Sequence, residues 1–446
     1  MCKGLSHFTS PYVFDAPNES IDLFQETVRF ACRWGWSEGT GSVKVRLLPR
    51  PHLEVDAQFP GLEFLLPTPV PEHLGLPARG MEIPGHVYSS STTMEGDAPA
   101  ASLTWVMPGQ QLVLLGTSTT LARRVVFHLL NFPEFTSREF SVETVGTTQH
   151  RISHLFLRCD DHTSHIRSLP STPSSAKALR DQGGFAVTHL GEIVRDDGGL
   201  IPVSEAQKVL AGLLLFFSFA SGAWSPPILP VGFDENGQHV WECWDPPRVS
   251  SYIYTPSWFD RQNGQHLEML WPGFMRLWAN EEWQQAIHEA VYWYLNSNNH
   301  LRGIDAGIIL TQAAIERLSF TYVVEMNKLL SLDGFKKASA ADRFRLLFSS
   351  LGIPLDIPPQ LKELTQLASA HNWADSPQGL TEMRNERVHV EHKKRGQFDK
   401  ALYEAWNLGL WYAEMVVLRL CGYDGEYGNR LVGRSPGQVV KVPWSH

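Results

Sequence analysis

Apolar and polar residues alternate along much of the first half of the chain. The alternating segments are separated by turns that contain Pro or Gly, and they cover residues 43–48, 52–59, 86–91, 102–107, 111–116, 150–158 and 184–194. A period of two residues is typical of strands that bury one face. Strands at such close spacing predict an antiparallel β-rich region, either a sandwich or a partly open barrel.

Four segments of this half follow other patterns. Residues 21–33 fit an edge strand or a short helix, and we expect a helix over 120–130. Residues 163–178 are rich in Ser and Pro, which predicts an exposed loop. Residues 204–220 begin with capping-box spacing (Ser204-Glu-Ala-Gln207) and then repeat apolar residues at helical intervals. This apolar stretch is too short to span a bilayer, so we expect a buried helix and no membrane partner.

From residue 266 the apolar period becomes helical. We expect helices over 281–295, 304–327, 340–351, 359–370 and 399–421, and one more helix that starts at the N-cap and first-turn pair Ser376 and Pro377. Helices joined by short links are typical of a bundle. The predicted class is therefore α+β, with a β-rich antiparallel module over 1–265, including the buried helix at 204–220, and a helical bundle with a short tail over 266–446.

Composition adds three expectations. With 43% hydrophobic residues and a net charge of −9, the chain is typical of a folded protein whose surface as a whole does not attract nucleic acid. Tryptophan is abundant between Trp224 and Trp293, and we expect these rings to fill a core rather than form a ligand platform. The five cysteines are scattered and no signal peptide is evident, which predicts a cytoplasmic protein.

The most informative stretch covers residues 380–395. Helical periodicity places Leu380, Met383 and Val390 on one face, and it places Asn385 and His389 one turn apart on another. Arg384 projects roughly 140° from His389, so its long side chain must curl round to meet the same ligand. Residues 384–395 contain five Lys or Arg against two Glu, which is a local excess of positive charge.

These residue types suit the cleavage of RNA without a metal. A neutral imidazole such as that of His389 moves a proton to or from a ribose 2′-hydroxyl or the leaving oxygen. A guanidinium such as that of Arg384 binds the phosphate and neutralises the charge that develops on it. Asn385 does not titrate, so we expect it to orient the histidine or to contact phosphate.

The spacing Arg384-Asn385-x-x-x-His389 resembles the signature of HEPN ribonucleases, which are helical bundles with this motif near the start of a late helix. Trp293-Tyr-Leu-Asn296 and Gln312-Ala-Ala-Ile-Glu316 resemble segments of ApeA-like HEPN proteins of bacterial defence. The likeness covers residues 280–421, and residues 183–189 and 217–224 resemble a β-rich region that often precedes such bundles. It implies a HEPN-like bundle, a catalytic role for Arg384, Asn385 and His389, and a homodimer in which two motifs form one composite site. Family variants with a tyrosine two places after the histidine are not matched, because Glu391 stands there.

Further residues are predicted to bind substrate or to support the motif, namely Glu316, Arg387, His392, Lys393 and Lys394. Glu316 lies in mid-helix among apolar neighbours, so we expect it to be buried against a cation, with Arg384 as the candidate. The alternative is that 380–395 forms a surface helix in which Arg384 makes one salt bridge, to Glu316 or to Glu391.

A second group of residue types suits zinc. The group consists of His154, Cys159, Asp160, Asp161, His162 and His165. Its spacings match no common zinc pattern, so we expect a polar loop that holds no metal. The chain also lacks a Walker phosphate loop, a dinucleotide-binding glycine fingerprint and a G-x-S-x-G motif, and we expect no cofactor.

The leading hypothesis is a metal-independent endoribonuclease that acts on RNA and leaves 2′,3′-cyclic phosphate ends. The resemblance further implies a toxin-like effector of phage defence, with a phage or host trigger that acts on the N-terminal module. One alternative is a non-catalytic scaffold that binds RNA or dimerises. Another is a carbohydrate or protein receptor, which would be favoured by a pocket lined by Trp224, Trp241 and Trp244.

Overall fold

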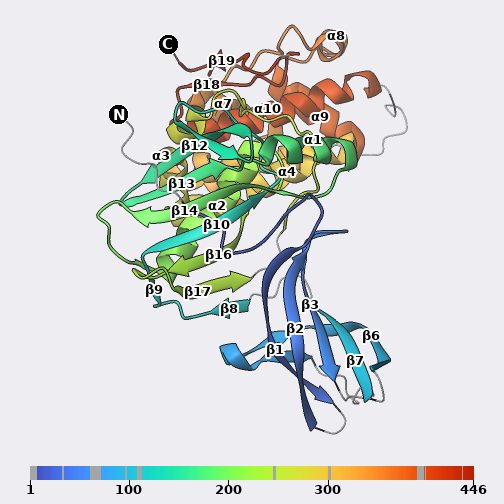
Figure 1. Ribbon diagram of the computed structural model, residues 1–446. Helices are drawn as coiled ribbons and strands as arrows, with labels where there is room; N and C mark the ends of the chain where they lie inside the picture. Colours follow the sequence, from blue (N-terminus) through green and yellow to red (C-terminus); the bar gives the residue numbers. More distant parts are fainter. Residues whose placement is uncertain are drawn as a thin grey trace.

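Two antiparallel sheets and a group of helices follow one another along the chain (Figure 1). The computed structural model describes residues 8–32, 35–60, 72–95, 98–107, 113–244, 248–299, 303–388, 396, 398–433 and 435–445. Figure 1 shows the N-terminal sheet at the bottom, the second sheet in the middle and most of the helices at the top. The protein is therefore mixed α+β, with a β-rich N-terminal half and a helical C-terminal part, as the sequence predicts.

The N-terminal sheet has seven strands in the order β5-β4-β1-β2-β3-β7-β6. The strands are β1 (Ile21–Cys32), β2 (Gly35–Arg46), β3 (His52–Pro60), β4 (His73–Leu76), β5 (Met81–Pro84), β6 (His86–Glu95) and β7 (Ala98–Val106). On β2, Val43 and Val45 are buried, whereas Lys44 between them is partly exposed. This alternation explains why the sequence predicts most of these strands.

The middle sheet has eight strands in the order β11-β12-β13-β14-β10-β16-β17-β8. The strands are β8 (Val113–Leu115), β10 (Arg124–Leu130), β11 (Phe140–Val145), β12 (Thr148–Cys159), β13 (His162–Ser168), β14 (Val187–Arg195), β16 (Pro227–Phe233) and β17 (His239–Trp244). A two-stranded pair, β9 (Leu121–Ala122) and β15 (Ile201–Pro202), and helix α1 (Thr172–Gln182) complete this part of the chain.

The central strands of the middle sheet are buried on both faces, whereas β11 at its edge is exposed. On β10, Phe127 and Leu129 belong to a core shared with the helices, while Val126 and Leu130 belong to a core shared with the N-terminal sheet. A strand buried on both faces is apolar at nearly every position. The helix predicted over 120–130 is therefore wrong, because this continuous apolar run hides the two-residue period.

The exposed loop predicted over 163–178 is also wrong. Strand β13 and helix α1 occupy most of this segment, and every residue of β13 is buried. The polar side chains of β13 have partners inside the protein. Thr163 donates a hydrogen bond to Asp196 (2.6 Å), and the hydroxyl of Ser168 accepts one from the amide of Ser153 (3.0 Å). A polar segment can be a buried strand when its polar groups are satisfied in this way.

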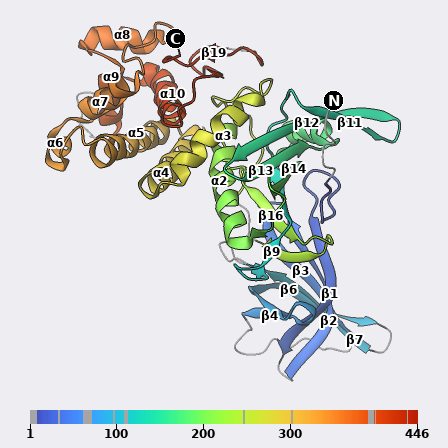
Figure 2. The same ribbon diagram turned by 90° about the vertical axis from the view of Figure 1, so that its left-hand side faces the viewer.

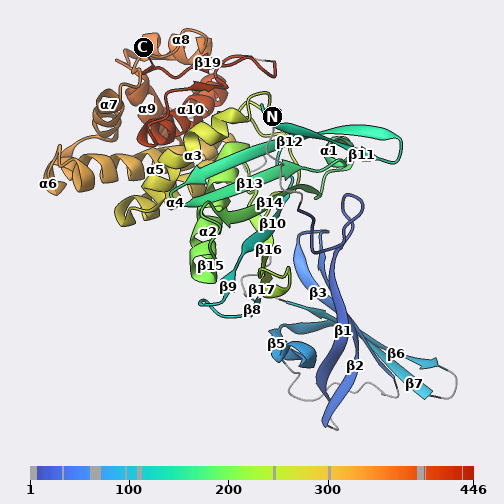
Figure 3. The same cartoon turned by 60° about the vertical axis from the view of Figure 1, so that its left-hand side comes forward.

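Helix α2 (Val203–Ser221) covers the face of the middle sheet that is turned away from the N-terminal sheet (Figure 3). By length and composition α2 could cross a membrane, but 61% of its apolar 18-residue stretch is buried inside the protein. That burial is typical of a core helix. The predicted capping box does not form, because α2 begins one residue before Ser204 and no side chain caps it.

The C-terminal part is mostly helical. Its elements are α3 (Gln265–Trp278), α4 (Glu281–Asn298), α5 (Ile304–Phe320), the π-helical turn Thr321–Met326, α6 (Leu332–Lys337), α7 (Ala340–Leu351), α8 (Lys362–His371), α9 (Ser376–Val388), α10 (Leu402–Leu420) and the short strands β18 (Glu426–Tyr427) and β19 (Val440–Lys441). Helix α10 is buried along most of its length and contacts α4, α5, α7 and α9. Figure 2 shows this group of helices at the opposite end of the molecule from the N-terminal sheet.

A buried carboxylate joins the N-terminal sheet to the middle sheet. Glu242 on β17 accepts hydrogen bonds from Tyr12 (3.2 Å) and from the indole of Trp244 (3.2 Å), and Arg79 contacts it at 3.3 Å. The guanidinium of Arg79 also lies 3.7 Å from the ring centroid of Phe24 on β1. Residues from both sheets therefore share one polar network.

A buried ion pair holds the C-terminal tail against the helices. Arg430 binds Glu414 of α10 at 2.6 Å, and both side chains are almost completely buried. The hydroxyl of Tyr294 on α4 donates to Glu414 (2.6 Å), and Arg430 also donates to the carbonyl of Pro256 (2.8 Å), in the segment before α3. Three parts of the chain thus depend on one charge pair.

We predict that Arg430→Met destabilises the protein by about 3–5 kcal/mol, because it leaves the carboxylate of Glu414 buried without its cation. Arg29→Met is the matched control: it breaks the exposed pair with Glu38, so it should cost less than about 1 kcal/mol. Urea unfolding of the two variants and the parent measures both changes. Equal losses for the two variants would contradict the structural role of Arg430.

Candidate functional site

Helix α9, which carries Arg384 and Asn385, is anchored at its first turn by Asp375. The carboxylate of Asp375 accepts a hydrogen bond from the amide of Gln378 (3.0 Å) and two from Arg345 of α7 (2.6 and 3.0 Å). Burial opposes ionisation of Asp375, but these hydrogen bonds outweigh it and lower the pKa of the carboxyl group. Ser376 is not the N-cap, as the sequence predicted, but the first helical residue, and its hydroxyl donates to the carbonyl of Asp356 (3.0 Å).

One face of α9 packs into the helical core. Leu380 and Met383 are buried, and the side chain of Gln312 on α5 donates to the carbonyl of Leu380. The apolar anchor predicted for this helix is confirmed for these two residues, while Val390 lies outside the described residues. Because α9 contacts α5, α7 and α10, its backbone and its polar edge are held in a fixed position.

Arg384 and Asn385 lie together on the polar edge of α9. The guanidinium of Arg384 donates to the side-chain oxygen of Asn385 at 3.2 Å, and both residues are half-buried. The Arg384 side chain therefore does bend toward the face that carries Asn385. Within the part of the chain that the structure describes, no carboxylate pairs with Arg384. His389, His392, Lys393 and Lys394 fall in residues 389–395, outside the described residues.

Two of the predicted supporting residues have structural partners. Glu316 pairs with Arg343 of α7, and its side chain is 45% exposed. The expectation that Glu316 is buried against Arg384 is therefore wrong, because the packing of α5 on α7 brings a different arginine to it. Arg387 binds Asp399, Glu386 (2.8 Å) and Asp305 (3.3 Å). Burial lowers the pKa of Arg387, but these carboxylates outweigh it and raise the value, so this guanidinium remains charged.

The six-residue group considered for zinc is divided between two places. Asp161 and His162 meet Glu205 of α2, with their ligand atoms within 4.8 Å of one another. Sequence reasoning missed Glu205, because it joins the other two only through the packing of α2 on the sheet. Three such side chains could hold a metal ion. However, Arg195 already pairs with Asp161 and lies 3.7 Å from Glu205, so the positive charge is supplied by the protein.

The other two histidines form part of a chain of hydrogen bonds across the middle sheet. Ser141 contacts His154 (2.8 Å), His154 contacts His165 (2.8 Å), and His165 contacts Glu192 (3.4 Å). Burial, together with the charges of His165 and Arg167, lowers the pKa of His154 to about 4. This imidazole is therefore neutral at pH 7 and contributes to a buried polar network.

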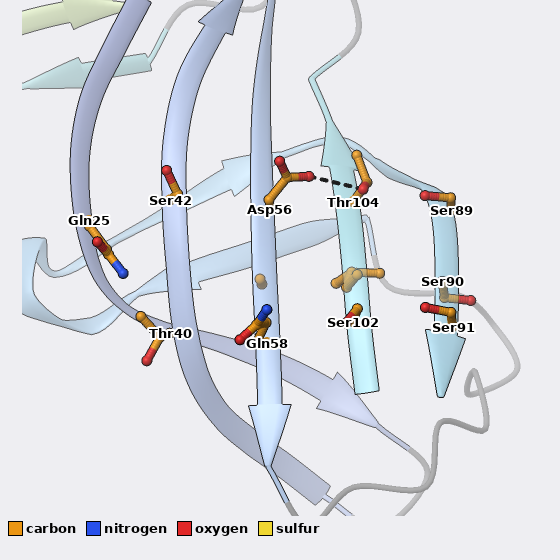
Figure 4. Close-up of a pocket in the computed structure, with 12 residues that line it drawn as sticks. Gln25, Thr40, Ser42, Asp56, Gln58, Ser89, Ser90, Ser91, Ser102 and Thr104 are labelled. Carbon is orange, nitrogen blue, oxygen red and sulfur yellow. Dashed lines mark hydrogen bonds between the residues drawn. The ribbon is translucent and has the colours of Figure 1, made fainter. Parts of the chain in front are cut away.

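A polar hollow of about 530 Å³ lies on the face of the N-terminal sheet turned away from its apolar core (Figure 4). Hydroxyl and amide side chains from five neighbouring strands line it, and the one carboxylate there, Asp56, binds Lys44 and Thr104 (3.0 Å). The hollow therefore carries little net charge.

The sequence also suggested a receptor pocket lined by three tryptophans. Two of them, Trp241 and Trp244, are each only 1% exposed, so they cannot line an open pocket.

Comparison with known proteins gives two family matches. Residues 117–255 match the YopA central domain, and residues 280–441 match the YopA C-terminal domain. A relative, the SPbeta prophage-derived uncharacterized protein YopA of Bacillus subtilis (strain 168), is 29% identical over 271 residues, which is 60% of this chain and 60% of that protein. No solved structure matches the chain. The two matched segments correspond to the middle sheet with α2 and to the helices from α4 onward.

Two buried histidines of the middle sheet predict a loss of stability in mild acid. Burial lowers the pKa of His128 to about 4 and that of His189 to about 3, against an ordinary value of 6.5. As the pH falls below 6.5, the unfolded chain takes up these protons and the folded protein does not. Each histidine should therefore lower the free energy of unfolding by about 2 kcal/mol between pH 6.5 and pH 5. Above pH 6.5 this loss is absent.

Urea unfolding at pH 7.5 and pH 5.0 measures this loss. His189→Phe, which keeps an aromatic ring beside Phe135, should reduce the loss by about 2 kcal/mol. His73→Gln is the control, because His73 is exposed and should leave the loss unchanged. The prediction fails if His189→Phe loses as much stability as the parent between the two pH values.

Proposed function

We propose that this protein is a metal-independent endoribonuclease whose C-terminal helices form a HEPN-like bundle. The observation that carries the proposal is the environment of Arg384. This guanidinium is half-buried, it donates to Asn385, and among the described residues it has no carboxylate partner. An external anion such as an RNA phosphate would supply the missing charge.

The neighbouring arginines strengthen this argument. Arg343 pairs with Glu316, Arg345 pairs with Asp375, and Arg387 pairs with Asp399. Each of these arginines has its charge neutralised within the protein, so each has a structural role. Among the described residues Arg384 has no such carboxylate partner, although it lies on the same helix as Arg387. The contrast supports a ligand-binding role for Arg384 rather than a role in holding the helices together.

The proposed reaction is a transesterification. The ribose 2′-oxygen forms a bond to phosphorus while the bond to the 5′-oxygen of the next nucleotide breaks, which gives a 2′,3′-cyclic phosphate and a 5′-hydroxyl end. In this proposal His389 takes the proton from the 2′-hydroxyl or gives one to the leaving oxygen. Arg384 stabilises the charge on the pentacoordinate phosphorus. Asn385 holds the guanidinium of Arg384 through its side-chain oxygen.

The biological setting is part of the same proposal. A homodimer that joins two motifs in one site would act in the cytoplasm as a toxin-like effector of phage defence. The N-terminal module would restrain it or respond to a phage or host trigger. Similarity to a prophage-derived protein supports a role in contests between phages and their hosts. The alternative, a non-catalytic scaffold, would bind RNA or dimerise through the same helices without cleaving RNA.

We predict that the purified full-length chain cleaves total RNA in the presence of EDTA and leaves cyclic-phosphate ends. His389→Ala should slow cleavage by about 10²- to 10⁴-fold, because it removes the acid–base group. Arg384→Ala should slow it by about 10²- to 10³-fold, because it removes a donor to the transition state. Rates from denaturing gels and chemical analysis of the RNA ends measure both effects.

His288→Ala and Arg158→Ala are matched controls, because both side chains are exposed on other elements, and both variants should cleave RNA like the parent. The assignment of the site is wrong if His389→Ala and Arg384→Ala also cleave like the parent. If the parent shifts RNA in a native gel but leaves it intact, the protein is an RNA-binding scaffold and not an enzyme.

A further inference from the structure

Three adjoining hollows lie where the middle sheet meets the segment that leads into α3. Their volumes are about 320, 80 and 30 Å³, and all three are lined by Pro133 and Arg261. Pro133 lies in the loop after β10, and Arg261 lies a few residues before α3. We refer to the three together as the junction cleft. Its largest hollow falls in the size range of small-molecule sites, which begins at roughly 300 Å³.

The walls of the junction cleft come from distant parts of the chain. The largest hollow is lined by α1, by the loop after β10, by Thr188 of β14, by Tyr252, Arg261 and Gln262, and by Pro436 of the C-terminal tail. Helix α1 and the loop after β10 lie in the segment that matches the YopA central domain. Pro436 lies in the segment that matches the YopA C-terminal domain. Ligand sites occur preferentially at such interfaces between domains.

Two arginines give the largest hollow its charge. Arg261 is half-buried, and Arg180 lies in the last turn of α1 at the exposed edge. Within the described ranges of the chain, neither guanidinium has a carboxylate partner. Arg261 instead lies over the ring of Tyr254, 5.2 Å from its centroid. This contact helps to hold the guanidinium in position and leaves its hydrogen-bond donors available.

Two carboxylates, Glu134 and Asp260, line the junction cleft near these arginines. Glu134 lines the largest hollow but is exposed to solvent. Asp260 is buried, and its carboxylate accepts hydrogen bonds from the amides of Gln262 (2.9 Å) and Gly437 (3.0 and 3.1 Å). Asp260 therefore fixes the C-terminal tail to the wall of the cleft. The residues that line the largest hollow thus include two arginines and one solvent-exposed carboxylate, Glu134.

We infer that the junction cleft binds a small phosphate-bearing molecule of about the size of a nucleoside monophosphate. Guanidinium groups bind phosphate through paired hydrogen bonds, which match its geometry. Tyr252 and Thr136 line the same hollow and offer an aromatic ring and a hydroxyl group to the rest of the ligand. A bounded hollow of about 320 Å³ suits a mononucleotide better than a polynucleotide. This site is separate from Arg384 and does not depend on ribonuclease activity.

The test is isothermal titration of the full-length protein with AMP, GMP, CMP, UMP and inorganic phosphate, each in a separate titration. We expect at least one nucleotide to bind at a stoichiometry of one per chain and more tightly than inorganic phosphate. Arg261→Gln and Arg180→Gln should each weaken that binding by about 10-fold or more, because each removes a charge-assisted hydrogen bond. Arg261→Lys keeps the charge but loses the paired geometry, so it should weaken binding less than Arg261→Gln.

Arg123→Gln is the control, because Arg123 is exposed and lies immediately before β10, whereas the cleft lies beyond the end of that strand. This variant should bind like the parent. Thermal unfolding of each variant shows that the cleft is folded, so that weakened binding cannot be assigned to loss of structure. The inference is overturned if no nucleotide binds the parent, or if Arg261→Gln and Arg180→Gln fold and bind like the parent.

Discussion

The burial of the middle sheet on both faces is the constraint on which the rest of the structure depends. The N-terminal sheet packs on one face, and α2 with the following helices packs on the other. The polar groups of its central strands therefore rely mainly on partners inside the protein. Strand β13 meets this requirement through hydrogen bonds to its neighbours. The same burial keeps His128 and His189 neutral.

The arginines that the structure describes fall into two groups: those with a carboxylate partner in the described protein and those without one. Arg430, Arg345 and Arg387 bind carboxylates and hold the tail, α7 and α9 in place. Arg384 and Arg261 are half-buried, and no described carboxylate pairs with either. A guanidinium cannot lose its charge at any pH that the protein experiences. An arriving anion therefore gains more free energy at these two positions than at an arginine that is already paired.

The sequence predicted the elements whose apolar residues recur at a clear period. The alternation in β2 and the helical period of α2 and α4 were sufficient, and so was the apolar anchor of α9. It could not predict β10 or β13, because the first is apolar on both faces and the second is polar but buried. It also could not predict which charges meet. The pairing of Glu316 with Arg343 depends on how α5 packs on α7, and no local pattern encodes that packing.

The two candidate sites are joined by a continuous series of contacts. Gly437 of the tail binds Asp260 in the wall of the junction cleft, and Arg430 of the same tail binds Glu414 on α10, which packs against α9. A ligand that binds only the folded cleft stabilises all of these contacts by mass action. It can change the position of α9 only if it prefers one of two arrangements of the tail. The buried Arg430–Glu414 pair opposes a second arrangement, because separating the two charges leaves each buried alone. A ligand in the cleft should therefore stiffen the connection between the sheet and the helices rather than act as a switch.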